Sequence, residues 1–111
     1  MNTQNFDTAI KHFGLTVVGI NRANGWNVTI PQDWGNAYKL ASNLALIHSE
    51  VSEALEAVRK NDRANFEEEM ADVMIRVIDT CHGLGVDLGP VIRAKLEANK
   101  KRGYRHGGKA I

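Results

Sequence analysis

The sequence predicts an all-α fold, a four-helix bundle-like domain that forms oligomers. Its long segments repeat apolar residues at intervals of three and four, which is the spacing of neighbours on one face of a helix. Only residues 27–30 have the character of a β-strand. A chain of 111 residues is long enough for one modest core but not for two. We therefore expect residues 1–111 to form a single domain without a sheet.

The apolar repeats place the four helices in order along the chain. Their expected ranges are residues 5–22, 34–60, 63–82 and 88–102. Polar residues near the starts are expected to cap them: Asn5 or Thr3 for the first helix, Asp33 for the second and Asp87 for the fourth. Pro90 is tolerated because it falls in the first turn of the fourth helix.

A loop of about ten residues, over residues 23–33, separates the first two helices. Loops of this length often carry function. Trp26 and Trp34 flank the loop. Each tryptophan either stacks on a nucleobase near a charged site or plugs the end of the bundle, and the sequence leaves both interpretations open.

Apolar stripes on the later helices are expected to face the core. They comprise Leu40, Leu44, Ile47, Val51, Ala54, Leu55 and Val58 on the second helix, Phe66, Met70, Val73, Met74 and Val77 on the third, and Leu88, Val91, Ile92 and Leu96 on the fourth. The third helix carries a further apolar strip, formed by Ala71, Ile75 and Ile78. Four helices cannot cover both of its faces, so we expect a partner subunit, in a homodimer or a homotetramer.

Two pairs of acidic residues, Glu50 with Glu53 and Glu69 with Asp72, stand on the second and third helices. Residues three apart are neighbours on a helix face, and a turn at residues 61–62 would fold the third helix back against the second. Four crowded carboxylates repel one another, so such a cluster is stable mainly when a cation neutralises it. Oxygen ligands suit Mg²⁺, with Mn²⁺ also possible. The alternative is a solvated acidic face.

The net charge of +1 conceals an uneven distribution of charge. Residues 50–72 carry eight acids and three bases, whereas residues 93–109 carry seven bases and one acid, an arrangement that suits a metal bound beside an anionic ligand. The acidic centre would repel a phosphate backbone and no apolar run could span a bilayer, so neither a nucleic-acid polymer nor a membrane is expected as a partner. Cys81 is the only cysteine, which fits a reducing, cytoplasmic setting.

The acidic motifs and their spacing resemble a known family. The pattern Glu50-x-x-Glu53, fifteen residues, Glu69-x-x-Asp72, with the local text EEMADVMIRVI, is similar to the E-x-x-E…E-x-x-D signature of the MazG-like all-α nucleoside triphosphate pyrophosphohydrolases. The resemblance covers about residues 34–109 and implies a MazG-type domain. It is specific for the superfamily and says nothing about which nucleotide is used.

The resemblance implies hydrolysis of a ribo- or deoxyribonucleoside triphosphate between its α and β phosphates, giving the monophosphate and pyrophosphate. Such a hydrolase would serve in house-cleaning of the nucleotide pool. The four acids would hold Mg²⁺ and provide the catalytic groups, and Glu53 would either bind metal or take a proton from the attacking water. Arg76, four residues after Asp72, would either contact phosphate or pair with that aspartate.

A basic segment that begins within the fourth helix resembles the family as well. Its text, Lys95-x-x-x-Asn99-x-x-Arg102-Gly103-Tyr104, resembles the family's segment at this place, which implies contacts with phosphate or sugar. A different class of function remains open: a non-catalytic helical interaction module whose acidic and basic faces pair between subunits. The two classes differ over metal, because only the enzyme should be stabilised by Mg²⁺ with a nucleotide. A weaker candidate is Asp79-x-x-His82, half of a di-iron motif.

Overall fold

The computed structural model describes residues 1–103, which form four α-helices and one short 3-10 helix. These elements are α1 (Thr3–Ala23), η1 (Pro31–Gly35), α2 (Ala37–Arg59), α3 (Arg63–Gly83) and α4 (Leu88–Arg102). No strand occurs within this range, and residues 27–30 do not form one. The predicted all-α class with four main helices is confirmed.

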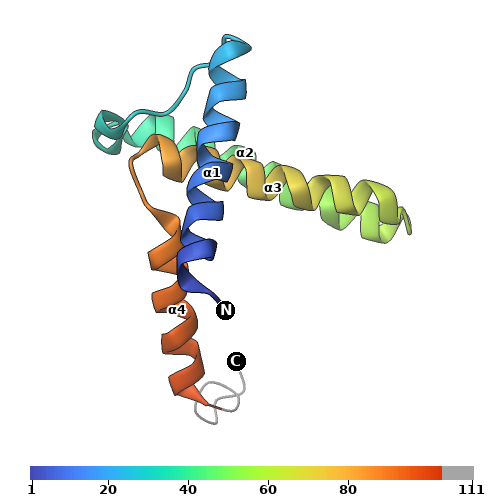
Figure 1. Ribbon diagram of the computed structural model, residues 1–111. Helices are drawn as coiled ribbons and strands as arrows, with labels where there is room; N and C mark the ends of the chain where they lie inside the picture. The colour runs from blue at the N-terminus through green and yellow to red at the C-terminus, as the bar shows by residue number, and fades with distance from the viewer. Residues whose placement is uncertain (104–111) are drawn as a thin grey trace.

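Helices α2 and α3 form an antiparallel hairpin, and α1 crosses this pair steeply (Figure 1). Helix α4 packs along the N-terminal half of α1 and runs away from the hairpin (Figure 1). The turn between α2 and α3 is tight because Asn61 adopts a left-handed conformation, with φ of 53°. Asp62 then caps α3 by accepting a hydrogen bond from the Asn65 amide. The predicted turn at residues 61–62 is therefore confirmed.

Small residues bring the helices close together. Ala54 and Ala57 are 3% and 1% exposed on the side of α2 that meets α3. Gly14 lets α1 approach α3, because a Cβ at this position would lie 2.6 Å from Nδ1 of His82. Small residues thus let α2 pack closely on α3, and α1 pack closely on the end of α3.

The connection between α1 and α2 is fastened to α2 by side chains. Asn43 donates to Oγ1 of the buried Thr29 at 3.0 Å, and Lys39 donates to the Val28 carbonyl at 3.3 Å. Lys39 also pairs with Asp33 at 2.6 Å. These contacts fix the segment that follows Trp26 against the hairpin.

Several predicted helix caps are wrong. Asn2 rather than Asn5 or Thr3 caps α1 with its side chain. Asn36 caps α2, because the chain first makes the 3-10 turn of η1, where Asp33 accepts from the Ile30 amide instead. At the start of α4, Asp87 occupies the N-cap position as predicted, but its side chain makes no capping hydrogen bond and its Oδ2 lies 3.7 Å from Nζ of Lys11.

Helix α4 is held to α1 by an ion pair and a close backbone approach. Arg93 donates to both carboxylate oxygens of Asp7, at 2.9 and 2.6 Å, and the hydrogen bond lowers the pKa of Asp7. A Cβ on Gly89 would lie 2.7 Å from Oδ1 of Asp7, so only glycine lets the helices meet here. The apolar edge predicted for α4 is only partly covered, since Val91 and Leu96 are 54% and 52% exposed.

The predicted inward stripes are wrong for much of α2 and α3. Large apolar side chains that were expected in the core are exposed, namely Leu44, Val51, Leu55, Val58, Met70 and Met74. Ile78, expected on the outer strip, is only 4% exposed and packs in the core with Val17 and Val18. On α2, the cause is that this helix meets α3 through Glu50, Ala54 and Ala57, which turns its larger apolar residues outward.

Among the described residues, no helix combines the length and the apolar character that crossing a bilayer requires.

Candidate metal centre

Carboxylates from α2 and α3 meet in the middle of the hairpin. One oxygen each from Glu50, Glu69 and Asp72 lies within 4.8 Å of the others. Glu50 is buried, Glu69 half-buried and Asp72 exposed, so the group has a covered side and an open side. Glu53 is exposed at the edge, near enough to share a hydrogen bond with Glu69. The antiparallel hairpin thus brings all four predicted acids together.

The crowding shifts the pKa values of two of the carboxyl groups. The pKa of Glu69 is raised to about 7, first by its hydrogen bond with Glu50, then by burial, and then by Glu53. The pKa of Glu50 is lowered, because it accepts hydrogen bonds from Glu69 and Arg76. Oε2 of Glu69 is buried and has no donor nearby when the neighbouring acids are ionised. A proton on Glu69 supplies the missing donor.

This arrangement fits a divalent cation. The three converging groups supply only oxygen atoms, the ligand type that Mg²⁺ and Mn²⁺ prefer. A cation bound between them would replace the shared proton and give the Oε2 atom of Glu69 an electrostatic partner. The residues present therefore fit a hard metal ion, with Glu50, Glu69 and Asp72 as first candidates for ligands and Glu53 beside them.

Arg76 lies at the covered side of the acidic cluster. Its Nε donates to Oε1 of Glu50 at 2.9 Å, and its side chain is 39% exposed. The ion pair considered with Asp72 is not the one that forms. Because the guanidinium has further donors, Arg76 can hold Glu50 and still contact an anion.

A cavity of about 320 Å³ adjoins the cluster through Arg76. It is lined by Asn21, Trp26, Asn27, Asn43, Leu46, Arg76 and Asp79. Trp26 is 65% exposed and provides an aromatic surface there. Oδ1 of Asp79 is buried without a hydrogen-bond partner among the described residues. A volume of this size is near the lower end for small-molecule pockets and suits part of a nucleotide.

The three asparagines that line this cavity were not predicted as site residues from the sequence. Asn21 and Asn27 lie on either side of a turn, and Asn43 stands on α2. One signal was present for Asn43, which precedes Glu50 by seven residues, or two helical turns, and so shares its face. That polar residue at the inner face of an amphipathic helix marks the cavity wall.

Other residues predicted to bind substrate lie apart from the cluster. Trp34 is 78% exposed on η1 and does not line the cavity. Lys95, Asn99 and Arg102 are exposed on the part of α4 that runs away from the hairpin (Figure 1). Tyr104 lies outside the described residues.

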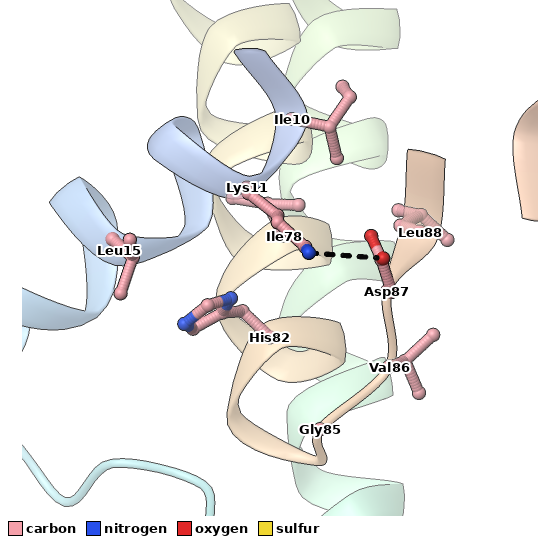
Figure 2. Close-up of a pocket in the computed structure, with 9 residues that line it drawn as sticks. All are labelled: Ile10, Lys11, Leu15, Ile78, His82, Gly85, Val86, Asp87 and Leu88. Atoms are coloured by element: carbon pink, nitrogen blue, oxygen red, sulfur yellow. Dashed lines mark ion pairs between the residues drawn. The ribbon is translucent and has the colours of Figure 1, made fainter. Parts of the chain in front are cut away.

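A second cavity, of about 310 Å³, lies between α1, the end of α3 and the start of α4. Figure 2 shows His82 on its wall, with Lys11 and Asp87 facing each other beside it. Asp79 lines the first cavity and His82 the second, so these two residues do not converge on one site. The di-iron motif is therefore not supported.

Comparison with known proteins agrees with the geometry. The family model described as the MazG nucleotide pyrophosphohydrolase domain matches residues 39–106, more than half of the chain, and this range includes all four acids. No curated protein and no solved structure matches the chain. The match, the all-helical architecture and the paired acidic motifs together place the chain in a family: it belongs to the MazG nucleotide pyrophosphohydrolase domain family.

Proposed function

We propose that this protein is a Mg²⁺-dependent nucleoside triphosphate pyrophosphohydrolase. It would cleave ribo- or deoxyribonucleoside triphosphates between the α and β phosphates, yield the monophosphate and pyrophosphate, and so remove unwanted nucleotides from the pool. The observation that supports this most directly is the convergence of Glu50, Glu69 and Asp72 within 4.8 Å in a chain of this family.

The acidic cluster would act as the metal-binding half of the site. Mg²⁺, with Mn²⁺ as a possible substitute, would neutralise charge that builds on the phosphate oxygens during cleavage. Glu50, Glu69 and Asp72 would hold the ion. Glu53 is exposed beside them, and it would either complete the ligand set or accept a proton from the attacking water.

The cavity would act as the nucleoside-binding half. Arg76 lines it while bonded to Glu50, so its guanidinium can contact a phosphate that lies between the metal and the nucleoside. Trp26 offers a surface on which a base can stack. Trp34 lies farther along the same connection and is a weaker candidate for this role.

We further propose that the protein works as a homo-oligomer, a dimer or a tetramer. The chain exposes 8291 Å² of surface, whereas a compact monomer of 12.3 kDa would expose about 6,100 Å². Its radius of gyration is 16.3 Å, against about 13 Å for a compact chain of this length. The apolar stripe of Leu44, Val51, Leu55 and Val58 is exposed on α2. A second copy that covers this stripe would remove the excess apolar surface.

An oligomer would also explain where the basic segment acts. Within one subunit, α4 runs away from the acidic hairpin, and Lys95, Asn99 and Arg102 are exposed (Figure 1). We propose that these residues contact the triphosphate bound at another subunit. Tyr104, in the same segment, is a further candidate for this contact. We also propose a cytoplasmic location, which the single, unpaired cysteine Cys81 would suit.

The alternative is a non-catalytic interaction module whose acidic and basic faces pair between subunits. The deciding experiment is a panel of canonical and modified triphosphates assayed for pyrophosphate release with Mg²⁺. The proposed enzyme releases pyrophosphate from at least one of them and is stabilised against heat by Mg²⁺ with a non-hydrolysable triphosphate. An interaction module does neither.

A further inference from the structure

Arg76 connects the acidic cluster with the cavity beside it. Its Nε atom donates to Oε1 of Glu50 at 2.9 Å, and the same side chain lines the cavity. The Glu50 side chain is 11% exposed and the Arg76 side chain 39% exposed, so the pair is covered at the carboxylate and open at the arginine. Among residues 1–103, Arg76 is the only base that forms an ion pair with any of the four acids. One side chain thus contacts both halves of the proposed site.

The guanidinium of Arg76 has two ends that can do different work. Nε carries a single N–H, which is directed at Glu50. The Nη atoms carry the remaining N–H donors, and within the described part of the chain these donors have no hydrogen-bond acceptor. Donors arranged in this planar fork match the oxygens of a phosphate group. The Nη end can therefore bind a triphosphate while the Nε end stays on Glu50.

The hydrogen bond from Nε also affects the metal centre. Glu50 is the only buried acid of the cluster, and its carboxylate has a second oxygen that a cation can use while Arg76 holds the first. A hydrogen bond to a metal-binding side chain fixes its orientation, and loss of such a bond commonly weakens metal binding about ten- to a hundredfold. Arg76 is thus placed to orient Glu50 for a cation.

We propose that Arg76 links the two halves of the site: its Nε positions Glu50 for metal binding, and its Nη atoms contact a phosphate of the nucleotide. This inference rests on the proposed function, which needs a cation at the cluster and a triphosphate beside it. Toward the metal, Arg76 acts through Glu50 and is a positioning residue, whereas it touches the nucleotide directly. If the ion pair only joined α2 to α3, replacing Arg76 would change the stability of the hairpin and neither affinity.

Two substitutions separate the two ends of the guanidinium. The amide nitrogen of glutamine stands at the same place along the side chain as Nε of arginine, so Arg76→Gln can keep the bond to Glu50 while it loses the charge and the Nη donors. Lysine has a methylene group at the place of Nε and carries its charge one atom farther out. Arg76→Lys therefore keeps a cation for the phosphate and loses the Nε donor.

Calorimetry on the full-length protein measures the two affinities separately. Mg²⁺ is titrated without nucleotide at about pH 8, above the raised pKa of Glu69. We expect Arg76→Lys to bind Mg²⁺ about tenfold more weakly than the wild-type protein. Arg76→Gln should bind it at least as tightly as the wild-type protein, because a positive charge near the cation is gone.

The second titration uses non-hydrolysable α,β-methylene analogues of the canonical ribo- and deoxyribonucleoside triphosphates, at a Mg²⁺ concentration that saturates each variant. For the analogue that the wild-type protein binds most tightly, we expect Arg76→Gln to lose about ten- to a hundredfold in affinity, since a charge-assisted contact with phosphate is removed. Arg76→Lys should stay within about threefold of the wild-type protein, because lysine still offers a charge to the phosphate.

The matched controls are Arg63→Gln and Arg63→Lys. Arg63 is an exposed arginine of the same helix that pairs with Glu67 outside the cluster, so its replacement should change neither affinity. Circular dichroism checks that all variants keep the helical fold. The inference is overturned if both Arg76 variants lose the same affinity, if neither affinity changes, or if the wild-type protein binds neither Mg²⁺ nor any analogue. If the two affinities separate as expected but no triphosphate is hydrolysed, the role of Arg76 stands and the proposed activity fails.

Discussion

The substitution Asp72→Asn should change stability in opposite directions with and without metal. It removes one of the three converging charges while it keeps the shape of the side chain. Without metal, the variant loses repulsion and should be more stable than the wild-type protein. With Mg²⁺, it loses a ligand and should be less stable. Hydrolysis should fall together with metal affinity.

The geometry sets the size of both effects. At 4.8 Å, repulsion between two unit charges is about 1 kcal/mol in a water-like medium and about 3.5 kcal/mol at an effective dielectric constant of about 20. Asp72 is exposed, so the lower figure applies, which corresponds to a rise of about 4 °C in the metal-free Tm. Mg²⁺ at a hundred times its Kd stabilises the wild-type protein by about 2.7 kcal/mol, and a tenfold weaker site halves this gain.

Thermal unfolding followed by circular dichroism, with chelator and with a series of Mg²⁺ concentrations, measures both effects. Glu68→Gln is the matched control, because it removes an acid from an exposed position of the same helix, outside the cluster. It should leave the stabilisation by Mg²⁺ unchanged. A lower metal-free Tm for Asp72→Asn, or equal stabilisation of this variant and the wild-type protein by Mg²⁺, would show that Asp72 is not part of a crowded metal site.

Three further predictions follow from the same structure. Light scattering should give a mass of at least twice 12.3 kDa for the wild-type protein. Leu55→Asp should lower this mass, whereas Ala45→Asp, at an exposed position off the apolar stripe, should not. A monomeric wild-type protein would contradict the proposed oligomer. Because the pKa of Glu69 is raised from 4.5 to about 7, the metal-free protein should lose stability as pH rises from about 4.5 to about 7. Mg²⁺ or Glu69→Gln should remove this loss, and a metal-free stability that does not fall over that range would argue against the shared proton. Lys95→Ala and Arg102→Ala should each lower kcat/KM about ten- to a hundredfold, mainly through KM, and leave Mg²⁺ binding unchanged. Unchanged nucleotide affinity with a lower Tm would instead mean that these two residues are structural.

The fold class and the carboxylate cluster were predictable because both depend on local spacing. The intervals of three and four define helices, and the turn at residues 61–62 requires an antiparallel hairpin. Once α2 and α3 are antiparallel, the acids of the two motifs lie at a similar level of the hairpin. Glu50 then meets Glu69 and Asp72 because α2 packs on α3 through the face that carries Glu50.

The packing face of α2 was not predictable from its apolar stripe. A helix normally buries its largest apolar side chains, yet α2 meets α3 through Ala54, Ala57 and the carboxylate of Glu50. Leu55 and Val58 point outward as a result. If a second subunit covers them, as we propose, the stripe is buried in the assembly. The periodicity of apolar residues alone cannot distinguish burial between subunits from burial inside one subunit.

The cavity could not be predicted either, because it forms only when separate parts of the chain meet in space. Its wall comes from four parts of the chain: the end of α1, the connection that follows it, α2 and α3. Asn43 and Asp79 are far apart in sequence and belong to no shared motif, so only their meeting in space shows a pocket. Arg76 likewise pairs with Glu50 from the opposite helix rather than with its sequence neighbour Asp72.

If the acidic hairpin hydrolyses a nucleoside triphosphate between its α and β phosphates, as we propose, the products identify the bond that is cleaved. The most direct measurement is phosphorus NMR of the products formed from each triphosphate of the panel, with Mg²⁺ and with chelator, for the wild-type protein and for Glu53→Gln. We expect equal amounts of nucleoside monophosphate and pyrophosphate from at least one substrate, only with the metal and only with the wild-type protein. Nucleoside diphosphate and phosphate as products, or no turnover of any triphosphate with Mg²⁺, would contradict the proposal.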